Sequence, residues 1–139
     1  MKIAIINGPN LNLIGIREPD VYGHESFEAY LETIKNNYPA VTFTYFQSNV
    51  EGELVTALQQ SGFEMDGIVF NPGGYTHTSV AIGDAIAAIS CPVIEVHISN
   101  IFAREDFRKI SHVSAKAVGV ISGLGLKGYE LALGYFLKK

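Results

Sequence analysis

The sequence is poor in cysteine and has no long hydrophobic run. Cys91 is the only cysteine among 139 residues, so no disulfide can form within the chain, and its apolar flanks favour a structural thiol over a nucleophile. No stretch approaches the ~18 apolar residues of a membrane span, and the apolar start is too short for a signal peptide. These features predict a cytoplasmic protein without a membrane partner.

Positive charge is also scarce. Ten Lys and Arg face fourteen Asp and Glu, which gives a formal net charge of −4 at pH 7. No overall positive field can hold a polyanionic backbone, so we expect no nucleic-acid partner. By contrast, 47% of the residues are hydrophobic, which is enough for a packed core. We expect a single domain over residues 1–139.

Apolar runs alternate with amphipathic segments along the chain. Short runs rich in Ile, Val or aromatic residues predict strands over 2–7, 41–46, 67–71, 92–97 and 117–121. Apolar residues at helical spacing predict helices from Ser26 to before Pro39, around 54–58, over 79–89, 107–110 and 126–137. Alternating strands and helices imply a parallel sheet with right-handed crossovers. We therefore predict an α/β flavodoxin-like, doubly wound, five-stranded sheet with helices on both faces.

Polar residues follow four of the predicted strands. Ligands of open parallel sheets bind beyond the carboxyl ends of the strands, where these residues would meet. The fourth strand carries Glu95 and His97, which at i and i+2 point to one face and can share a hydrogen bond that fixes the imidazole. This pair suits an oriented general acid or base. The alternative is a histidine satisfied by a backbone group beside a glutamate at a strand end.

Residues 15–23 form a charged loop bracketed by glycines, directly after the first strand. The loop is typical of a mobile lid and carries Arg17 and Tyr22. A neighbouring guanidinium favours the phenolate of a tyrosine, whose ordinary pKa is ~10. The alternative is a surface loop with an ordinary ion pair.

Two further segments are rich in glycine. In 71–79, small residues precede three hydroxyl residues and His77, which suits a small oxygen-rich ligand; alternatively Thr78 or Ser79 caps a helix and His77 is solvated. The segment 123–128 has the spacing of a dinucleotide fingerprint, but that fingerprint needs an acidic residue ~20 positions later. Only eleven residues follow residue 128, so tight strand-to-helix packing is the better explanation. A phosphate loop and zinc-type spacings are also missing.

Together these motifs resemble type II 3-dehydroquinate dehydratases (3-dehydroquinases) over nearly the whole chain. The likeness rests on residues 7–12, 15–23, 71–79, 95–100 and the Gly-rich start of the last helix. It implies a flavodoxin-like catalytic domain that removes water from 3-dehydroquinate through an enolate. The product would be 3-dehydroshikimate, an intermediate of aromatic amino acid biosynthesis by the shikimate pathway, and neither a metal nor an organic cofactor would be needed.

The resemblance also implies catalytic roles. Tyr22 would be the base that takes the C2 proton, and Arg17 would lower its pKa. Asn10 would hold a water that stabilises the enolate oxygen. His97 would be the acid that protonates the departing C1 hydroxyl, and Glu95 would orient it. A base, an enolate stabiliser and an acid at separate points are what β-elimination from a ketone needs.

Five more residues would bind the substrate by the same resemblance. The backbone amides of Ile98 and Ser99 would bind the substrate carboxylate. Asn71, His77 and Arg108 would recognise the ring hydroxyls. A flavodoxin-like binding or signalling module is the competing interpretation of the chain. It would require a phosphate-binding first loop or an acidic phosphoacceptor pocket, and the first loop offers Asn and Pro instead.

The resemblance finally implies a homododecamer built from trimers, in which Asp84 reaches a neighbouring site. The helix of Asp84 has apolar residues around most of its circumference, so it needs cover on more than one side; burial within its own subunit is the alternative. Gly83 stands where the family often has a bulkier residue, which is expected to alter the trimer contacts. His24 after the lid is also unusual, and its effect on lid closure is not predicted.

Overall fold

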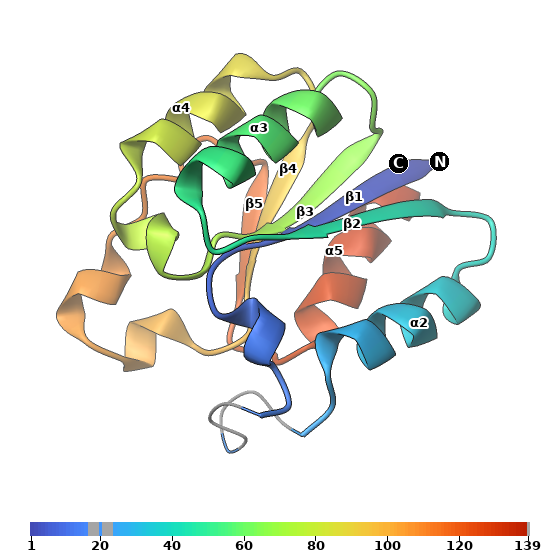
Figure 1. Cartoon of the computed structure of the whole chain (residues 1–139), viewed down its shortest axis with the longest axis horizontal. Coiled ribbons are helices and arrows are strands. Elements are labelled where there is room, and N and C mark those ends of the chain that lie inside the picture. The colour runs from blue at the N-terminus through green and yellow to red at the C-terminus, as the bar shows by residue number, and fades with distance from the viewer. Residues whose placement is uncertain (17–19, 21–23, 139) are drawn as a thin grey trace.

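The computed structural model describes residues 1–16, 20 and 24–138 and is built around one parallel sheet (Figure 1). Its strands are β1 (Lys2–Asn7), β2 (Thr42–Gln47), β3 (Gly67–Asn71), β4 (Val93–His97) and β5 (Gly119–Ser122). They lie in the order β2-β1-β3-β4-β5, and every neighbouring pair is parallel. This is the doubly wound order of flavodoxin-like folds, so the predicted fold class is confirmed.

Four α-helices of the described residues cover the two faces of the sheet. Helices α3 (Glu51–Ser61) and α4 (Val80–Ala88) lie on one face, and α2 (Phe27–Asn37) and α5 (Lys127–Leu137) lie on the other (Figure 1). Each face has its own apolar cluster, because successive strand residues point to opposite sides. Cys91 is buried in the cluster beneath α3 and α4, as expected of a structural thiol.

The local signals in the sequence account for most element boundaries. The Ser26 hydroxyl accepts a hydrogen bond from the Ala29 amide at 3.1 Å, which begins α2. All residues of β1 after Lys2 are buried, as its unbroken apolar run predicts. The other strands and helices begin and end within a few residues of the predicted positions.

The crossover between β4 and β5 differs from the other connections. It contains two short 3-10 helices, η3 (Ile101–Ala103) and η4 (Asp106–Lys109), where the sequence predicts only one short helix over 107–110. Two more 3-10 turns, η1 (Leu11–Leu13) and η2 (Gly73–His77), follow β1 and β3. All four therefore lie past the carboxyl ends of strands. Within the described residues, no helix is long and apolar enough to cross a membrane.

Candidate active site

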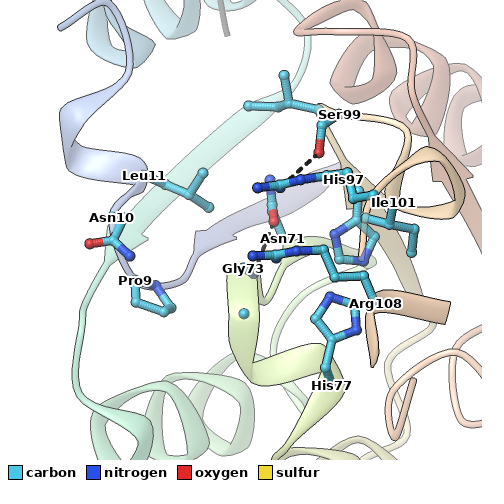
Figure 2. A pocket seen from close by; sticks show the side chains of 13 residues that line it. Pro9, Asn10, Leu11, Asn71, Gly73, His77, His97, Ser99, Ile101 and Arg108 are labelled. Carbon is cyan, nitrogen blue, oxygen red and sulfur yellow. Dashed lines mark hydrogen bonds between the residues drawn. The ribbon is translucent and has the colours of Figure 1, made fainter. Parts of the chain in front are cut away.

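A pocket lies at the carboxyl edge of the sheet, between the segments that follow β1, β3 and β4 (Figure 2). The edge is where the sequence places its polar strand ends, and the residues come together from distant parts of the chain. Seven predicted site residues line the pocket: Asn10, Asn71, His77, His97, Ile98, Ser99 and Arg108. Arg104, Pro9 and Leu11 also line it and were not predicted as site residues.

Glu95 and His97 form the hydrogen bond expected from their spacing on β4. Nε2 of His97 lies 3.2 Å from Oε2 of Glu95, and the glutamate is fully buried. An ionised carboxylate can only accept, so Nε2 carries the proton of this bond. The other ring nitrogen, Nδ1, remains for chemistry with a ligand. His97 itself lines the pocket (Figure 2).

The carboxylate of Glu95 is surrounded by hydroxyl groups that sequence reasoning did not assign. Oε1 accepts hydrogen bonds from the hydroxyls of Thr76 at 3.2 Å, Ser111 at 3.1 Å and Ser114 at 3.0 Å. The Ser114 hydroxyl also lies 2.8 Å from Oε2. Burial by itself raises the pKa of Glu95, but the hydrogen bond and charge of His97 and the serine hydroxyls outweigh it, so the pKa is held below its ordinary value.

His77 is buried, and its ring lies beside that of His97 in the pocket wall. Their ring centroids are 6.3 Å apart, and the rings are nearly parallel. Nδ1 of His77 lies 2.7 Å from the Ile110 carbonyl oxygen, which can only accept, so Nε2 is left as an acceptor. Burial lowers the pKa of His77, and so do the nearby His97 and Arg108. The alternative interpretation of this segment is half right: the Ser79 hydroxyl caps α4, but His77 is not solvated, because its ring is buried and anchored by the Ile110 carbonyl.

The backbone after β4 is held by two hydrogen bonds to its carbonyl oxygens. The carbonyl oxygens of His97 and Ile98 accept hydrogen bonds from the amides of Gly123 and Gly125 at 3.1 and 3.0 Å. In a trans peptide, the carbonyl of one residue and the N–H of the next point in opposite directions. The N–H groups of Ile98 and Ser99 therefore point away from the glycine loop, and both residues line the pocket.

The glycine loop has two structural tasks. Gly123 has a φ of 89° and Gly125 a φ of 64°, a region in which other residues are strained. A Cβ on Gly128 would lie 3.2 Å from Val96 Cγ1, so this residue allows α5 to pack closely on the sheet. The packing explanation is confirmed for Gly128, and holding the carbonyls of His97 and Ile98 is a task that the sequence did not reveal.

Asn71 belongs to a second buried network beneath the pocket. Its Oδ1 accepts the Gly73 amide at 3.0 Å, and its Nδ2 donates to the Tyr129 hydroxyl at 3.0 Å. The fully buried Tyr129 hydroxyl in turn donates to Oδ1 of Asn7 at 2.8 Å. One N–H of the Asn71 amide is left, so Asn71 can act towards a ligand as a donor.

Asn10 lies in the loop after β1, opposite the two histidines in Figure 2. Its φ of 70° is left-handed, which asparagine tolerates better than most residues. The Asn10 amide donates to Oδ1 of Asn49 at 3.0 Å, and Gln47 holds the preceding Gly8 carbonyl at 3.1 Å. Asn49 after β2 and Gln47 at the end of β2 thus fix the backbone around Asn10.

Two arginines from the segment after β4 supply positive charge to the pocket. Nε of Arg108 lies 2.7 Å from Oε2 of Glu105, which orients the side chain near His77. Nη1 of Arg104 donates to the Ser99 hydroxyl at 3.4 Å, beside the Ser99 amide. The signal that could have identified Arg104 is its spacing of four from Arg108, in a chain with only ten Lys and Arg.

Four predicted site residues remain. Glu95 is fully buried and does not line the pocket, but it is hydrogen-bonded to His97, which does. Arg17 and Tyr22, and most of the predicted lid, lie outside the described residues. Asp84 is on the exposed side of α4 and does not line the pocket of its own chain. Gly83 faces inward, and a Cβ there would collide with the His112 carbonyl, so its small size is explained within the subunit.

Comparison with known proteins relates this site to one enzyme family. Residues 1–137 match the family model described as dehydroquinase class II. A curated 3-dehydroquinate dehydratase of Fusobacterium nucleatum subsp. nucleatum is 53% identical, with 99% of this chain and 97% of the relative covered. One of Caldicellulosiruptor saccharolyticus is also 53% identical, with the same coverage. The crystal structure of a type II dehydroquinase from Butyrivibrio crossotus superposes with a TM-score of 0.94 at 46% identity, covering 99% of this chain and 97% of that one. The chain therefore belongs to the class II dehydroquinase family.

Proposed function

We propose that this chain is a type II 3-dehydroquinate dehydratase, a hydro-lyase of the shikimate pathway. It catalyses the reversible anti elimination of water from 3-dehydroquinate to 3-dehydroshikimate through an enolate. The observation that carries this proposal is the His97 ring, held by the buried carboxylate of Glu95 and lining a pocket with two arginines. Such a ring can deliver a proton to a leaving hydroxyl.

The second half of the reaction is the acid step. Protonated His97 donates its Nδ1 proton to the C1 hydroxyl as the C1–O bond breaks, and the hydroxyl leaves as water. The electron pair of the enolate forms the new C1–C2 double bond. Glu95 keeps Nε2–H as its hydrogen-bond partner throughout, so the ring cannot turn its Nδ1 away from the substrate.

The first half of the reaction is proton abstraction. Tyr22 takes the C2 proton as a phenolate, which Arg17 favours electrostatically. The resulting negative charge develops on the ketone oxygen, where a water held by Asn10 stabilises it. The left-handed backbone at Asn10 and its anchor to Asn49 support this role, because they fix the residue at the pocket wall.

Substrate binding uses groups of opposite hydrogen-bonding character. The N–H groups of Ile98 and Ser99 bind the substrate carboxylate, and Arg104 adds positive charge beside them. Asn71 and Arg108 donate hydrogen bonds to ring hydroxyls. Nε2 of His77 accepts from a hydroxyl because Nδ1 is engaged by Ile110. No step of this scheme requires a metal or an organic cofactor.

The active form is a homododecamer of trimers in the cytoplasm, in which Asp84 completes the site of a neighbouring subunit. Two features support this assembly: Asp84 is exposed, and Val80 on the same helix is 59% exposed although it is apolar. Light scattering tests it. A species near the chain mass of 15.1 kDa with full activity would contradict the shared site.

The direct test of the activity adds 3-dehydroquinate to the protein and follows the ultraviolet absorbance of the conjugated product. Absorbance should rise with wild type and not with Tyr22→Phe, which lacks only the hydroxyl of the base. General bases contribute roughly 100- to 10,000-fold, so a Phe variant with more than about a tenth of the activity would exclude Tyr22 as the base. No product from wild type would favour a binding or signalling module.

A further inference from the structure

The hydroxyl groups around Glu95 form a cluster that does not line the pocket. We name Thr76, Ser111 and Ser114 the hydroxyl cage. The three residues come from η2 and from the segment after η4, and they converge on a carboxylate with no exposed surface. A buried carboxylate without donors is costly, so these hydrogen bonds are what allow Glu95 to remain ionised there.

Each cage hydroxyl has its proton available for Glu95. The Ser111 oxygen already accepts the amides of Val113 at 3.1 Å and Ser114 at 2.9 Å, so its acceptor capacity is filled and its proton points to Oε1. Oε1 is thereby occupied by hydroxyls. Oε2 is left to His97, with the Ser114 hydroxyl 2.8 Å away as its second partner.

The segment that carries the two serines is itself held firmly in place. The His112 amide donates to the Thr76 carbonyl at 2.8 Å, which joins the segment to η2. Val113 is fully buried beneath α4, and Gly83 of α4 leaves just enough room for the His112 carbonyl. The cage is therefore a rigid support and can hold the carboxylate in one orientation.

We propose that Ser114, assisted by Ser111 and Thr76, is a positioning residue for proton donation, which fixes the ionised carboxylate of Glu95 and through it the ring of His97. This inference rests on the proposed function, because it assigns Ser114 to the acid step of that reaction. Ser114 touches both carboxylate oxygens and is the cage residue closest to the oxygen that holds His97.

Among the described residues, the charged and titratable groups that act on this site are His97, His77 and Arg108. His97 lies on the same strand as Glu95, and His77 of η2 faces both of them. Arg108 of η4 acts on His77. Removing a cage hydroxyl weakens the support of the carboxylate, which makes protonation of Glu95 easier as the pH falls.

The test uses Ser114→Ala in the full-length protein with 3-dehydroquinate as substrate. The kcat of dehydration should fall on the order of tenfold to a hundredfold, the range expected for one hydrogen bond to a charged group. The KM should change little, because Ser114 does not line the pocket. The acidic limb of the kcat profile should move to higher pH. Exchange of the C2 proton in deuterated water should rise relative to dehydration, because the enolate returns to substrate when its acid is impaired.

A matched control is Ser48→Ala. The Ser48 hydroxyl also donates to a carboxylate, Oε1 of Glu53 at 2.6 Å, and also accepts a backbone amide, that of Val50 at 2.9 Å. It lies outside the pocket, so its loss should leave both the pH profile and the exchange ratio unchanged. Ser114→Thr, which retains a hydroxyl, should restore the wild-type ratio.

The outcomes separate the inference from the proposed function. Wild-type protein that fails to dehydrate 3-dehydroquinate overturns both. Active wild type together with a Ser114→Ala variant of unchanged exchange ratio and pH profile overturns the inference alone. If Ser114→Ala does not fold, Ser111→Ala decides: it removes a donor from Oε1 only, so a smaller shift in the same direction supports the cage, and no shift contradicts it.

Discussion

Two buried polar networks lie at the carboxyl edge of the sheet, and they differ in charge. One surrounds the carboxylate of Glu95 on the face covered by α3 and α4. The other joins Asn7, Asn71 and Tyr129 on the face covered by α2 and α5. The carboxylate of the first and the phenol of the second are both fully buried.

The difference lies in what each network leaves for the pocket. In the neutral network the side chains bond mainly to one another, and Tyr129 joins the ends of β1 and β3. Only one amide N–H of Asn71 is left for a ligand. The charged network collects donors around an anion and presents a ring nitrogen that can carry a proton. The neutral network therefore serves mainly to fix the strand ends, whereas the charged one serves chemistry.

The largest expected effect is that of breaking the charged network at the ring. His97→Ala should reduce dehydration by roughly 100- to 10,000-fold, the contribution of a general acid. Exchange of the substrate C2 proton should persist, because enolate formation requires Tyr22 and not His97. Deuterium uptake followed by NMR measures this directly. Loss of exchange along with loss of product would contradict the separation of base and acid.

Tyr129→Phe breaks the neutral network and should affect stability more than turnover. It leaves Oδ1 of Asn7 and Nδ2 of Asn71 without their buried partner, which costs about 1 to 3 kcal/mol. Urea unfolding measures the loss. The ratio of C2 exchange to dehydration should stay at the wild-type value, and a change in that ratio would show that the neutral network also serves the acid step.

Gly83→Ala should disturb the charged network through the segment that carries Ser111 and Ser114. The added Cβ would collide with the His112 carbonyl, so the segment of the cage serines must shift. Overpacking of this kind costs about 1 to 3 kcal/mol of stability. Unlike Tyr129→Phe, this variant should also raise the ratio of C2 exchange to dehydration. An unchanged ratio in a destabilised variant would mean that the cage tolerates the shift.

The smallest expected effect is on the pH dependence of stability. The charged network should respond at acidic pH and the neutral network at alkaline pH. The pKa of Glu95 is lowered in the folded state, despite its burial, by His97 and the serines. Its contribution is therefore complete above the unfolded pKa of ~4.3 and is lost as the pH falls through the folded value. The free energy of unfolding, measured with urea, should therefore fall by the same amount in acid for wild type and for Tyr129→Phe.

At alkaline pH the two proteins should differ. Burial raises the pKa of Tyr129, so its contribution is complete below the unfolded pKa of ~10 and is lost as the pH rises towards the folded value. Burial likewise raises the pKa of Tyr45 to about 12, and Tyr45 is present in both proteins. Wild type should lose stability more steeply above pH ~10 than Tyr129→Phe does. Parallel curves there would contradict the role of Tyr129.

The sequence predicts what depends on local periodicity and misses what depends on distant contacts. Strand and helix patterns give the sheet, and alternation along β4 places Glu95 and His97 on one face. The cage serines could not be found in this way, because they lie 16 and 19 residues from Glu95 in a segment without regular structure. Tyr129 reaches Asn7 across 122 residues, and its apolar helix face predicts burial alone.

The orientation of the site residues depends on the same kind of distant contact. The sequence places His77 at a helix start, but only the Ile110 carbonyl decides which ring nitrogen faces a ligand. The Gly-rich segment before α5 predicts close packing, and the hydrogen bonds from Gly123 and Gly125 that hold the carbonyls of His97 and Ile98 become visible only in the structure. A buried glutamate next to a histidine is itself a reason to search for hydroxyl donors.

The acid step depends on the charge of Glu95, and Glu95→Gln tests this dependence most directly because it keeps the shape of the side chain and removes its charge. The measurement is the rate of dehydration beside the rate of C2 exchange, at neutral pH and with folding checked by urea unfolding. We predict a folded variant in which dehydration is reduced by at least about tenfold, because His97 loses a charged hydrogen-bond partner, and in which C2 exchange is retained. Dehydration and exchange both at wild-type rates would show that the carboxylate contributes shape alone, and would contradict a role for its charge in proton donation by His97.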